Sequence, residues 1–149
     1  MGMVATLVRI KADDLKYLEV GLRPPEPPLE VIDVDVLWES ILFLFGNGVM
    51  GASVTGDIFM PSEAIGSEEE IEYGGGIRYH TPDVIVAVNR KIGHLTDADL
   101  RAIADPNKMQ MVYRFRPEYV DEIVEHCLAI IKLFATAEQN GDIVLGSID

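Results

Sequence analysis

One segment near the C-terminus, Pro117 to Asn140, constrains the fold more than any other part of the sequence. Proline is favoured at the first position of a helix, and the apolar residues that follow it recur at helical spacing. This pattern predicts a long C-terminal amphipathic helix that buries one side, with Cys127 in the core rather than in the role of a nucleophile. The buried stripe is made of Val120, Ile123, Val124, Cys127, Leu128, Ile131, Phe134 and Ala135.

Both ends of the chain are predicted to be strands. Met3 to Ile10 is rich in Val, Ile, Leu and Thr, and Ile143 to Ile148 follows the turn-forming pair Asn140-Gly141. A third strand is predicted at Met109 to Phe115, where the side chains alternate between two faces. Strands at both ends with helices between them predict an α+β fold. We expect a single compact domain over residues 1–149, with a small sheet that includes both terminal strands and is packed by several helices.

Four shorter helices are predicted from their start signals, at about residues 13–19, 33–45, 82–92 and 96–104. The second is capped by Asp33 and carries Trp38 on its apolar stripe, as a core residue rather than a platform for a ligand. The third begins with Thr81-Pro82-Asp83, which supplies a hydroxyl cap and a proline at the first helical position. The fourth begins with Thr96 and Asp99, a pair at capping-box spacing.

Two regions interrupt this pattern. Residues 23–30 hold four prolines in five positions, which can enter neither a helix nor an inner strand. They predict a stiff extended connector, with a docking segment for an aromatic groove as the alternative. Residues 46–76 form an irregular, glycine-rich and acidic region, and its run Ser67 to Glu70 is expected to be a solvated loop or the first turn of a helix.

The charge of the chain limits its partners. The net charge is −13 over 149 residues, which argues against nucleic-acid binding because the phosphate backbone would be repelled. Residues 78–116 hold seven of the 12 Lys and Arg residues against four acids, so this segment carries +3 and the remainder −16. The uneven charge is consistent with solubility and chance clustering, with an acidic face for a basic protein partner, or with one basic pocket for a small anion.

Other features exclude several classes of protein. No apolar run approaches the ~20 residues that span a bilayer, and no basic stretch precedes an apolar core at the N-terminus. A cytoplasmic protein without membrane contact is expected. Cys127 is the only cysteine and the three histidines lie far apart in the sequence, so no metal site and no cofactor are expected. No Gly-x-Ser-x-Gly motif occurs, and the sequence leaves open whether the chain is an enzyme.

The stretch YGGGIRYHTPD, residues 73–83, is the one candidate for a ligand loop. Consecutive glycines can present backbone amides to an anion, and a helix N-terminus follows. However, Ile77 to Thr81 separate the glycines from that helix, and the lysine of a phosphate-binding loop is absent. The alternative is a flexible turn, a short strand and a capped helix. The candidate ligand-binding residues are Gly74, Gly75, Gly76, Arg78, Tyr79 and His80.

Four segments resemble the YfbM-like family, a bacterial domain family of unknown function. They are MGM at the start, IDVDVLW, the block YGGGIRYHTPD…LTDADLRAIADPNKM, and the tail YVDEIVEHCLAIIKLFATAEQNGDIVLGSID. The resemblance implies a single α+β domain, usually alone and cytoplasmic, with no established activity. In that family the tryptophan helix commonly continues with a histidine and ends in Thr-Gly. Here Leu42 and the turn Gly46-Asn47-Gly48 occupy the corresponding places, which puts any catalytic site common to the family in doubt.

Two functions from different classes remain. The first is a non-catalytic protein-interaction module whose acidic surface binds a basic protein, for example an immunity-type protein that neutralises a basic toxin. The second is a binding protein or an enzyme that takes a small anion or phosphate ligand through the loop from Gly74 to His80. Either would be a monomer or a homodimer.

Overall fold

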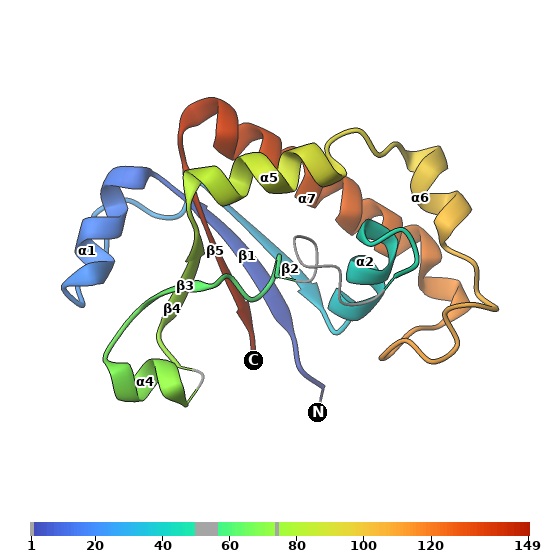
Figure 1. Cartoon of the computed structure of the whole chain (residues 1–149), viewed down its shortest axis with the longest axis horizontal. Helices are drawn as coiled ribbons and strands as arrows, with labels where there is room; N and C mark the ends of the chain where they lie inside the picture. Colours follow the sequence, from blue (N-terminus) through green and yellow to red (C-terminus); the bar gives the residue numbers. More distant parts are fainter. Residues whose placement is uncertain (1, 50–56, 74) are drawn as a thin grey trace.

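The computed structural model describes residues 2–49, 57–73 and 75–149, and it is an α+β fold built on one sheet (Figure 1). The strands are β1 (Ala5–Ile10), β2 (Glu30–Asp35), β3 (Glu63–Ile65), β4 (Ile77–His80) and β5 (Ile143–Ile148). The α-helices are α1 (Leu15–Glu19), α2 (Trp38–Phe45), α4 (Glu68–Glu72), α5 (Pro82–Ile92), α6 (Asp97–Ile103) and α7 (Val120–Asn140). Two 3-10 turns, η1 (Ala12–Asp14) and η2 (Pro117–Tyr119), precede α1 and α7.

The described strands form one antiparallel sheet in the order β2-β1-β5-β4-β3. The sheet includes both terminal strands, as predicted, and they lie side by side within it. Backbone hydrogen bonds of 2.8 Å in both directions join Val4 to Asp149 and extend this pairing to the chain ends. Since β5 pairs with both β1 and β4, it joins the two halves of the sheet.

One face of the sheet carries the core. Figure 1 shows α2, α5, α6 and α7 gathered on one side of the sheet, and α7 contacts the other three helices. Side chains alternate between the two faces of a strand, so β1 directs Ala5 and Leu7 toward the helices, and β5 directs Val144 there. The apolar stripe of α7 meets them with Ile123, Val124, Cys127, Ile130, Leu133 and Phe134, all at most 1% exposed. The predicted fold class and the long C-terminal helix are confirmed. The predicted buried stripe of that helix is wrong in part, because Ile130 and Leu133 are buried whereas Ala135 is exposed.

The predicted helix over residues 33–45 is wrong in its first part. Residues 30–35 form β2, and the helix α2 starts only at Trp38, after a turn that Asp35 enters with a φ of 52°. Ile32 and Val34 alternate with exposed Asp33 and Asp35, which is the two-residue period of a strand. The boundary between β2 and α2 is hard to see in the sequence. The apolar residues before Trp38 fit both the two-residue period of a strand and the period of a helix.

The predicted strand at Met109–Phe115 is also wrong. These residues form a series of turns, and Arg114 has a φ of 59°, which a strand does not allow. Met109 is fully buried while Met111 is 95% exposed, although a strand would direct both to the same face. The alternation in the sequence had no partner strand to pair with, and local turns satisfied the backbone instead.

The starts of the other predicted helices are confirmed. The Thr81 hydroxyl accepts a hydrogen bond from the amide of Val84, with Pro82 at the start of α5. Thr96 and Asp99 form a reciprocal capping box at α6. The short helix near residues 13–19 is present as η1 and α1, and the acidic run 68–70 forms the first turn of α4 with Ser67 as its cap.

Candidate functional site

The face of the sheet opposite the main helices is the candidate functional site. Its centre is a row of directly paired residues on four strands, and pairing partners share a face. The row, which we call the apolar row, consists of Val31, Val8, Leu145 and Tyr79 in that spatial order. Val31 is 57% exposed and the other three are partly exposed. Four neighbouring strands thus present apolar side chains to solvent.

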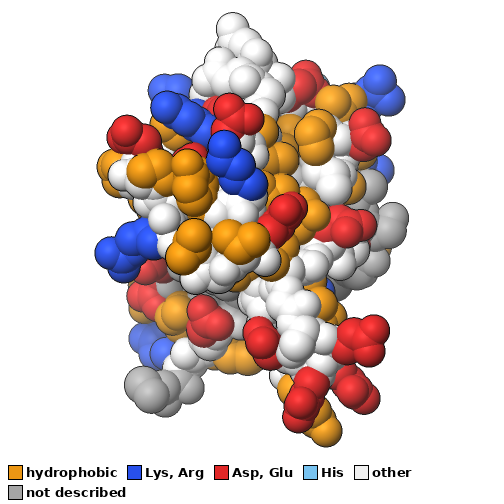
Figure 2. Space-filling model, turned by 90° about the vertical axis from the view of Figure 1, so that its left-hand side faces the viewer, with side chains coloured by type: hydrophobic (Ala, Val, Ile, Leu, Met, Phe, Trp, Pro, Cys, Tyr) orange, Lys and Arg blue, Asp and Glu red, His pale blue; other side chains and the backbone are white. Residues whose placement is uncertain are grey.

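Acidic side chains stand at both ends of this row. Glu63 of β3 pairs with Tyr79, and Asp33 follows two residues after Val31 on the same face of β2. Both are exposed. Figure 2 shows hydrophobic side chains gathered across the middle of this side of the molecule, with acidic side chains dense at its lower right. An apolar strip with carboxylates at its margins is suited to a partner that is both apolar and basic.

The proline-rich connector, residues 23–30, covers one end of this face of the sheet. Val8, Ile10 and Leu145 form the floor of a cavity of about 550 Å³, and Leu18 of α1 and residues 23–28 complete its walls. We call this cavity the connector pocket. None of residues 23–29 belongs to a helix or strand, and Glu30 begins β2. The stiffness of consecutive prolines keeps this segment extended above the sheet instead of collapsing onto it.

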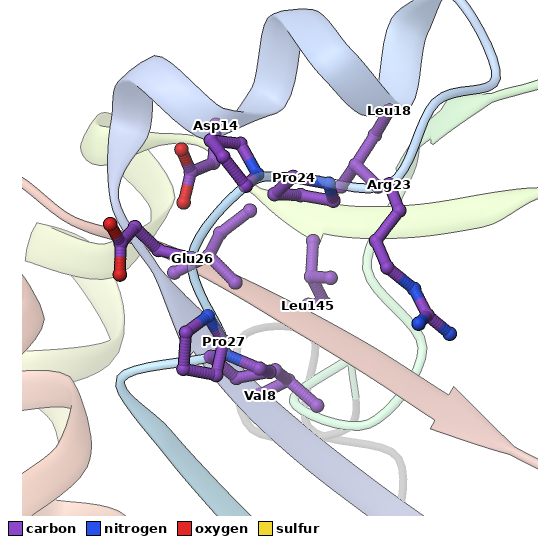
Figure 3. Close-up of a pocket in the computed structure, with 11 residues that line it drawn as sticks. Val8, Asp14, Leu18, Arg23, Pro24, Glu26, Pro27 and Leu145 are labelled. Atoms are coloured by element: carbon purple, nitrogen blue, oxygen red, sulfur yellow. The ribbon is translucent and has the colours of Figure 1, made fainter.

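Charged groups of both signs stand around the connector pocket (Figure 3). The carboxylates of Asp14 and Glu26 lie on one side, and the Arg23 side chain extends on the other side, away from them. Asp14 is only 8% exposed, and among the described residues its carboxylate has no hydrogen-bond or ion-pair partner. Its two oxygens still touch water. Together with Glu26, it makes one side of the cavity acidic.

The predicted ligand-loop residues are not gathered at one point. Arg78 and His80 face the core side of the sheet, whereas Tyr79 lies on the opposite side in the apolar row. The Arg78 guanidinium donates a 3.2 Å hydrogen bond to the carbonyl oxygen of Pro61, and its buried Nε has no partner among the described residues. Arg78 therefore holds the segment around residues 58–61 against the inner face of the sheet.

His80 holds the same segment. It is 1% exposed, its Nε2 lies 2.7 Å from the carbonyl oxygen of Ile58, and its ring packs edge-on against Phe134 at 5.4 Å between centroids. Burial lowers the pKa of His80 below its ordinary value of 6.5, although the Ile58 carbonyl and the charge of Asp57 oppose that shift. The carbonyl oxygen can only accept, so this hydrogen bond requires a proton on Nε2.

The described glycines of this stretch have backbone roles. The amide of Gly75 donates to the carbonyl oxygen of Glu70 in α4, at 2.7 Å. Gly76 has a φ of 83°, and a side chain there would meet the carbonyl oxygen of Ile65 at 2.7 Å. Gly74 lies outside the described residues. A turn followed by a strand and a capped helix is what the described part of the stretch forms.

The basic segment 78–116 does not make one cationic surface. Arg101 forms ion pairs with Asp97 at 2.7 Å and with Asp121, and Arg78 faces inward. Arg90, Lys91 and His94 do line a second hollow of about 850 Å³. That hollow lies at the C-terminal ends of α2 and α5, whose dipoles are negative there, and Asp99 also lines it. The hollow therefore mixes cationic side chains with negative groups.

Three further features bear on chemistry. Cys127 is fully buried, and burial strongly raises the pKa of its thiol, so it is not a nucleophile. Among the described residues, no three of His, Cys, Asp and Glu gather as ligands for a metal ion. No helix in the described ranges is long and apolar enough to cross a membrane.

Reasoning from the sequence overlooked the connector pocket and the apolar row. Asp14 lies within the predicted helix at about residues 13–19, and Val31 precedes the predicted helix over residues 33–45. The strict alternation Ile32-Asp33-Val34-Asp35 could have revealed the edge strand. The pairing that brings Val8 beside Leu145, which is far away in the sequence, had no local signal.

Comparisons with known proteins agree with this architecture. The family described as "Domain of unknown function (DUF1877)" matches residues 1–146. Among solved structures, a protein of unknown function, YfbM from Escherichia coli, is similar over 95% of this chain and 97% of its own, with a TM-score of 0.57 and 13% sequence identity. No curated protein sequence matches. The resemblance to the YfbM-like family is confirmed, and at this identity the structural similarity shows the fold alone.

Proposed function

The chain belongs to the DUF1877 family of domains of unknown function, and we propose that it is a non-catalytic interaction module that binds a basic protein through the outer face of its sheet. The observation that carries this proposal is the apolar row of Val31, Val8, Leu145 and Tyr79, which no long helix of the described chain covers. Surfaces of this kind often mark interaction sites, because apolar area that stays in contact with water in the free protein is removed from it on binding.

Charge supports a basic partner. The chain outside residues 78–116 carries a net charge of −16, and Asp33 and Glu63 stand at the ends of the apolar row. Complementary charge speeds the encounter of two proteins, and the effect weakens as salt screens it. We therefore expect an association rate that falls with ionic strength. Neutralisation of a basic toxin by an immunity-type protein is one form that such binding takes.

A photo-cross-linking experiment tests this proposal. The cross-linking residue p-benzoylphenylalanine is placed at Val31 on the outer face, and at Glu125, an exposed position on α7, as the control. We expect a protein with a basic surface to be cross-linked in cells at Val31 and not at Glu125, and to be identified by mass spectrometry. Equal cross-linking at both positions, or none at Val31, would contradict the proposal.

A pair of charge reversals tests the electrostatic part. Glu63→Lys and Glu125→Lys change the net charge equally, but only the first lies beside the apolar row. With the identified partner, we expect Glu63→Lys to slow association more than Glu125→Lys at low salt, and the difference to shrink at high salt. Equal effects would show that only the overall charge of the molecule matters.

The alternative of a small-anion site at Gly74 to His80 has less support. The Arg78 guanidinium and the Gly75 amide, two of its donors, already have hydrogen-bond partners within the chain, and Tyr79 lies on the opposite face. A phosphate or carboxylate ligand that stabilises the wild type against heat, but not Arg78→Ala, would favour this alternative over the interaction module.

A further inference from the structure

We infer that the connector pocket receives a lysine or arginine side chain of the basic partner, with its charged head beside Asp14 and Glu26 and its aliphatic stem on the apolar floor. This inference rests on the proposed function and names the chemistry of one contact within it. The structure supplies a cavity of about 550 Å³ that is apolar below and acidic on one side. That combination matches a side chain with a long apolar stem and a cationic end.

The Asp14 carboxylate points to a cationic occupant. It is 8% exposed, it lines the pocket, and no described residue donates a hydrogen bond or an ion pair to it. The residue is largely buried while its carboxylate oxygens still reach water, and a cation that enters the pocket would replace that water with a charge-assisted hydrogen bond. The neighbouring Glu26 carboxylate lies on the same side and would share the charge of the entering group (Figure 3).

The floor of the pocket selects against a small bare cation. Val8, Ile10 and Leu145 offer no oxygen ligands through their side chains, whereas metal ions such as Ca²⁺ and Mg²⁺ require several. The same three side chains can pack against the methylene groups of a lysine or arginine. Arg23 extends away from the two carboxylates, so its charge does not compete for them (Figure 3).

The pocket also adjoins the surface already proposed for the partner. Val8 and Leu145 belong both to the pocket floor and to the apolar row. A partner segment that crosses the row would therefore pass the mouth of the pocket, and a single basic side chain could enter it while the segment stays on the sheet. This continuity assigns the cation to a protein rather than to a free amine.

Blocked tripeptides test the pocket directly. Acetyl-Gly-Lys-Gly-amide and its arginine counterpart serve as probes, and the norleucine peptide, which keeps an aliphatic stem without the charge, is the control. In amide NMR titrations of the full chain, we expect saturable shifts centred on Val8, Asp14 and Leu145 with a basic peptide, and much weaker ones with norleucine. Equal shifts with norleucine, or no saturable shift with either basic peptide, would overturn the inference.

Two asparagine variants locate the charge. Asp14→Asn keeps the size of the side chain, and Asp13→Asn removes a neighbouring exposed carboxylate that does not line the pocket. We expect Asp14→Asn to weaken binding of the basic peptide by about tenfold, from the loss of one charge-assisted contact, and Asp13→Asn to leave it nearly unchanged. Equal weakening by both variants would overturn the inference.

The stability of the free protein separates ligand binding from a structural role of Asp14. If the carboxylate has no partner in the folded chain, Asp14→Asn should unfold at the same temperature as the wild type or a higher one. A clear fall in the unfolding temperature would show that the carboxylate is already paired within the chain, and would overturn the inference.

The two proposals fail in distinguishable ways. If the partner cross-links at Val31 as strongly in Asp14→Asn as in the wild type, the interaction module stands and the pocket is not its contact. If a basic peptide fills the pocket but no protein is cross-linked at Val31, the pocket binds cations and the interaction module fails.

Discussion

Two polar side chains of β4, Arg78 and His80, fasten the segment around residues 58–61 to the inner face of the sheet. Each reaches one carbonyl oxygen of that segment, Pro61 for Arg78 and Ile58 for His80. The fastening buries Ile58 and Phe59 completely. Basic residues beside a run of glycines can thus serve packing, because a buried carbonyl oxygen needs a donor as much as an anion does.

His80 should make the stability of the protein depend on pH. Burial lowers the pKa of His80 in the folded chain below the 6.5 of the unfolded chain. The unfolded chain therefore takes up the proton first as the pH falls. The stabilisation is fully present above about pH 6.5 and is lost as the pH falls from there toward the folded-state pKa.

Urea unfolding at neutral pH and at mildly acidic pH measures this effect. The free energy of unfolding of the wild type should fall over this interval, and that of His80→Gln, which cannot take up a proton, should fall less. Carboxylates contribute little because most of them titrate at lower pH. If both proteins lose the same free energy, the buried imidazole is not the source of the dependence.

At the scale of elements, the approach of the 57–61 segment to β5 depends on one glycine. A side chain at Gly146 would meet Cδ of Pro61 at 2.9 Å and the carbonyl oxygen of Phe59 at 3.1 Å. Gly146 lies on the inner face, opposite Arg78 and Leu7, at the point where segment and sheet touch. The absence of a side chain there, rather than an unusual backbone angle, makes the close packing possible.

Gly146→Ala should therefore destabilise the protein. The added methyl group forces Pro61 or the Phe59 carbonyl group to move, and we expect a loss of about 1–3 kcal/mol in the free energy of unfolding. Urea unfolding gives the value, with Ser147→Ala on the opposite face as the control, expected to lie within about 0.5 kcal/mol of the wild type. A neutral Gly146→Ala would mean that the segment moves away at no cost.

At the scale of the whole molecule, the sheet depends on its last strand. β5 is the only described strand that pairs with both β1 and β4, so it joins the half formed by β1 and β2 to the half formed by β3 and β4. It also supplies Leu145 to the outer face and Val144 to the core. The long helix α7 would lose part of its sheet without it.

A chain that ends at Gly141 should not fold. Without β5 the two halves of the sheet have no common partner, and we expect a spectrum with little amide dispersion and no cooperative unfolding on heating. A chain that lacks only Asp149 is the control. It should still unfold cooperatively, because it loses only the two terminal hydrogen bonds to Val4 and keeps the pairing of residues 143–148 with β1 and β4. Cooperative unfolding of the shorter chain would show that the helices and the remaining strands suffice.

The sequence by itself determined the elements whose signals are local. The stripe of α7, the caps Thr81 and Thr96, and the two terminal strands follow from the spacing and hydrogen-bonding groups of neighbouring residues. The tertiary structure alone decided the rest. Strand pairing placed Val8 beside Leu145, and β2 extended into residues that the sequence predicts as helix. Residues 109–115 found no partner strand. The cavity beside Asp14 formed beneath the connector. The reason is physical: a helix satisfies its hydrogen bonds within itself, whereas a strand and a pocket exist only when residues distant in the sequence come together.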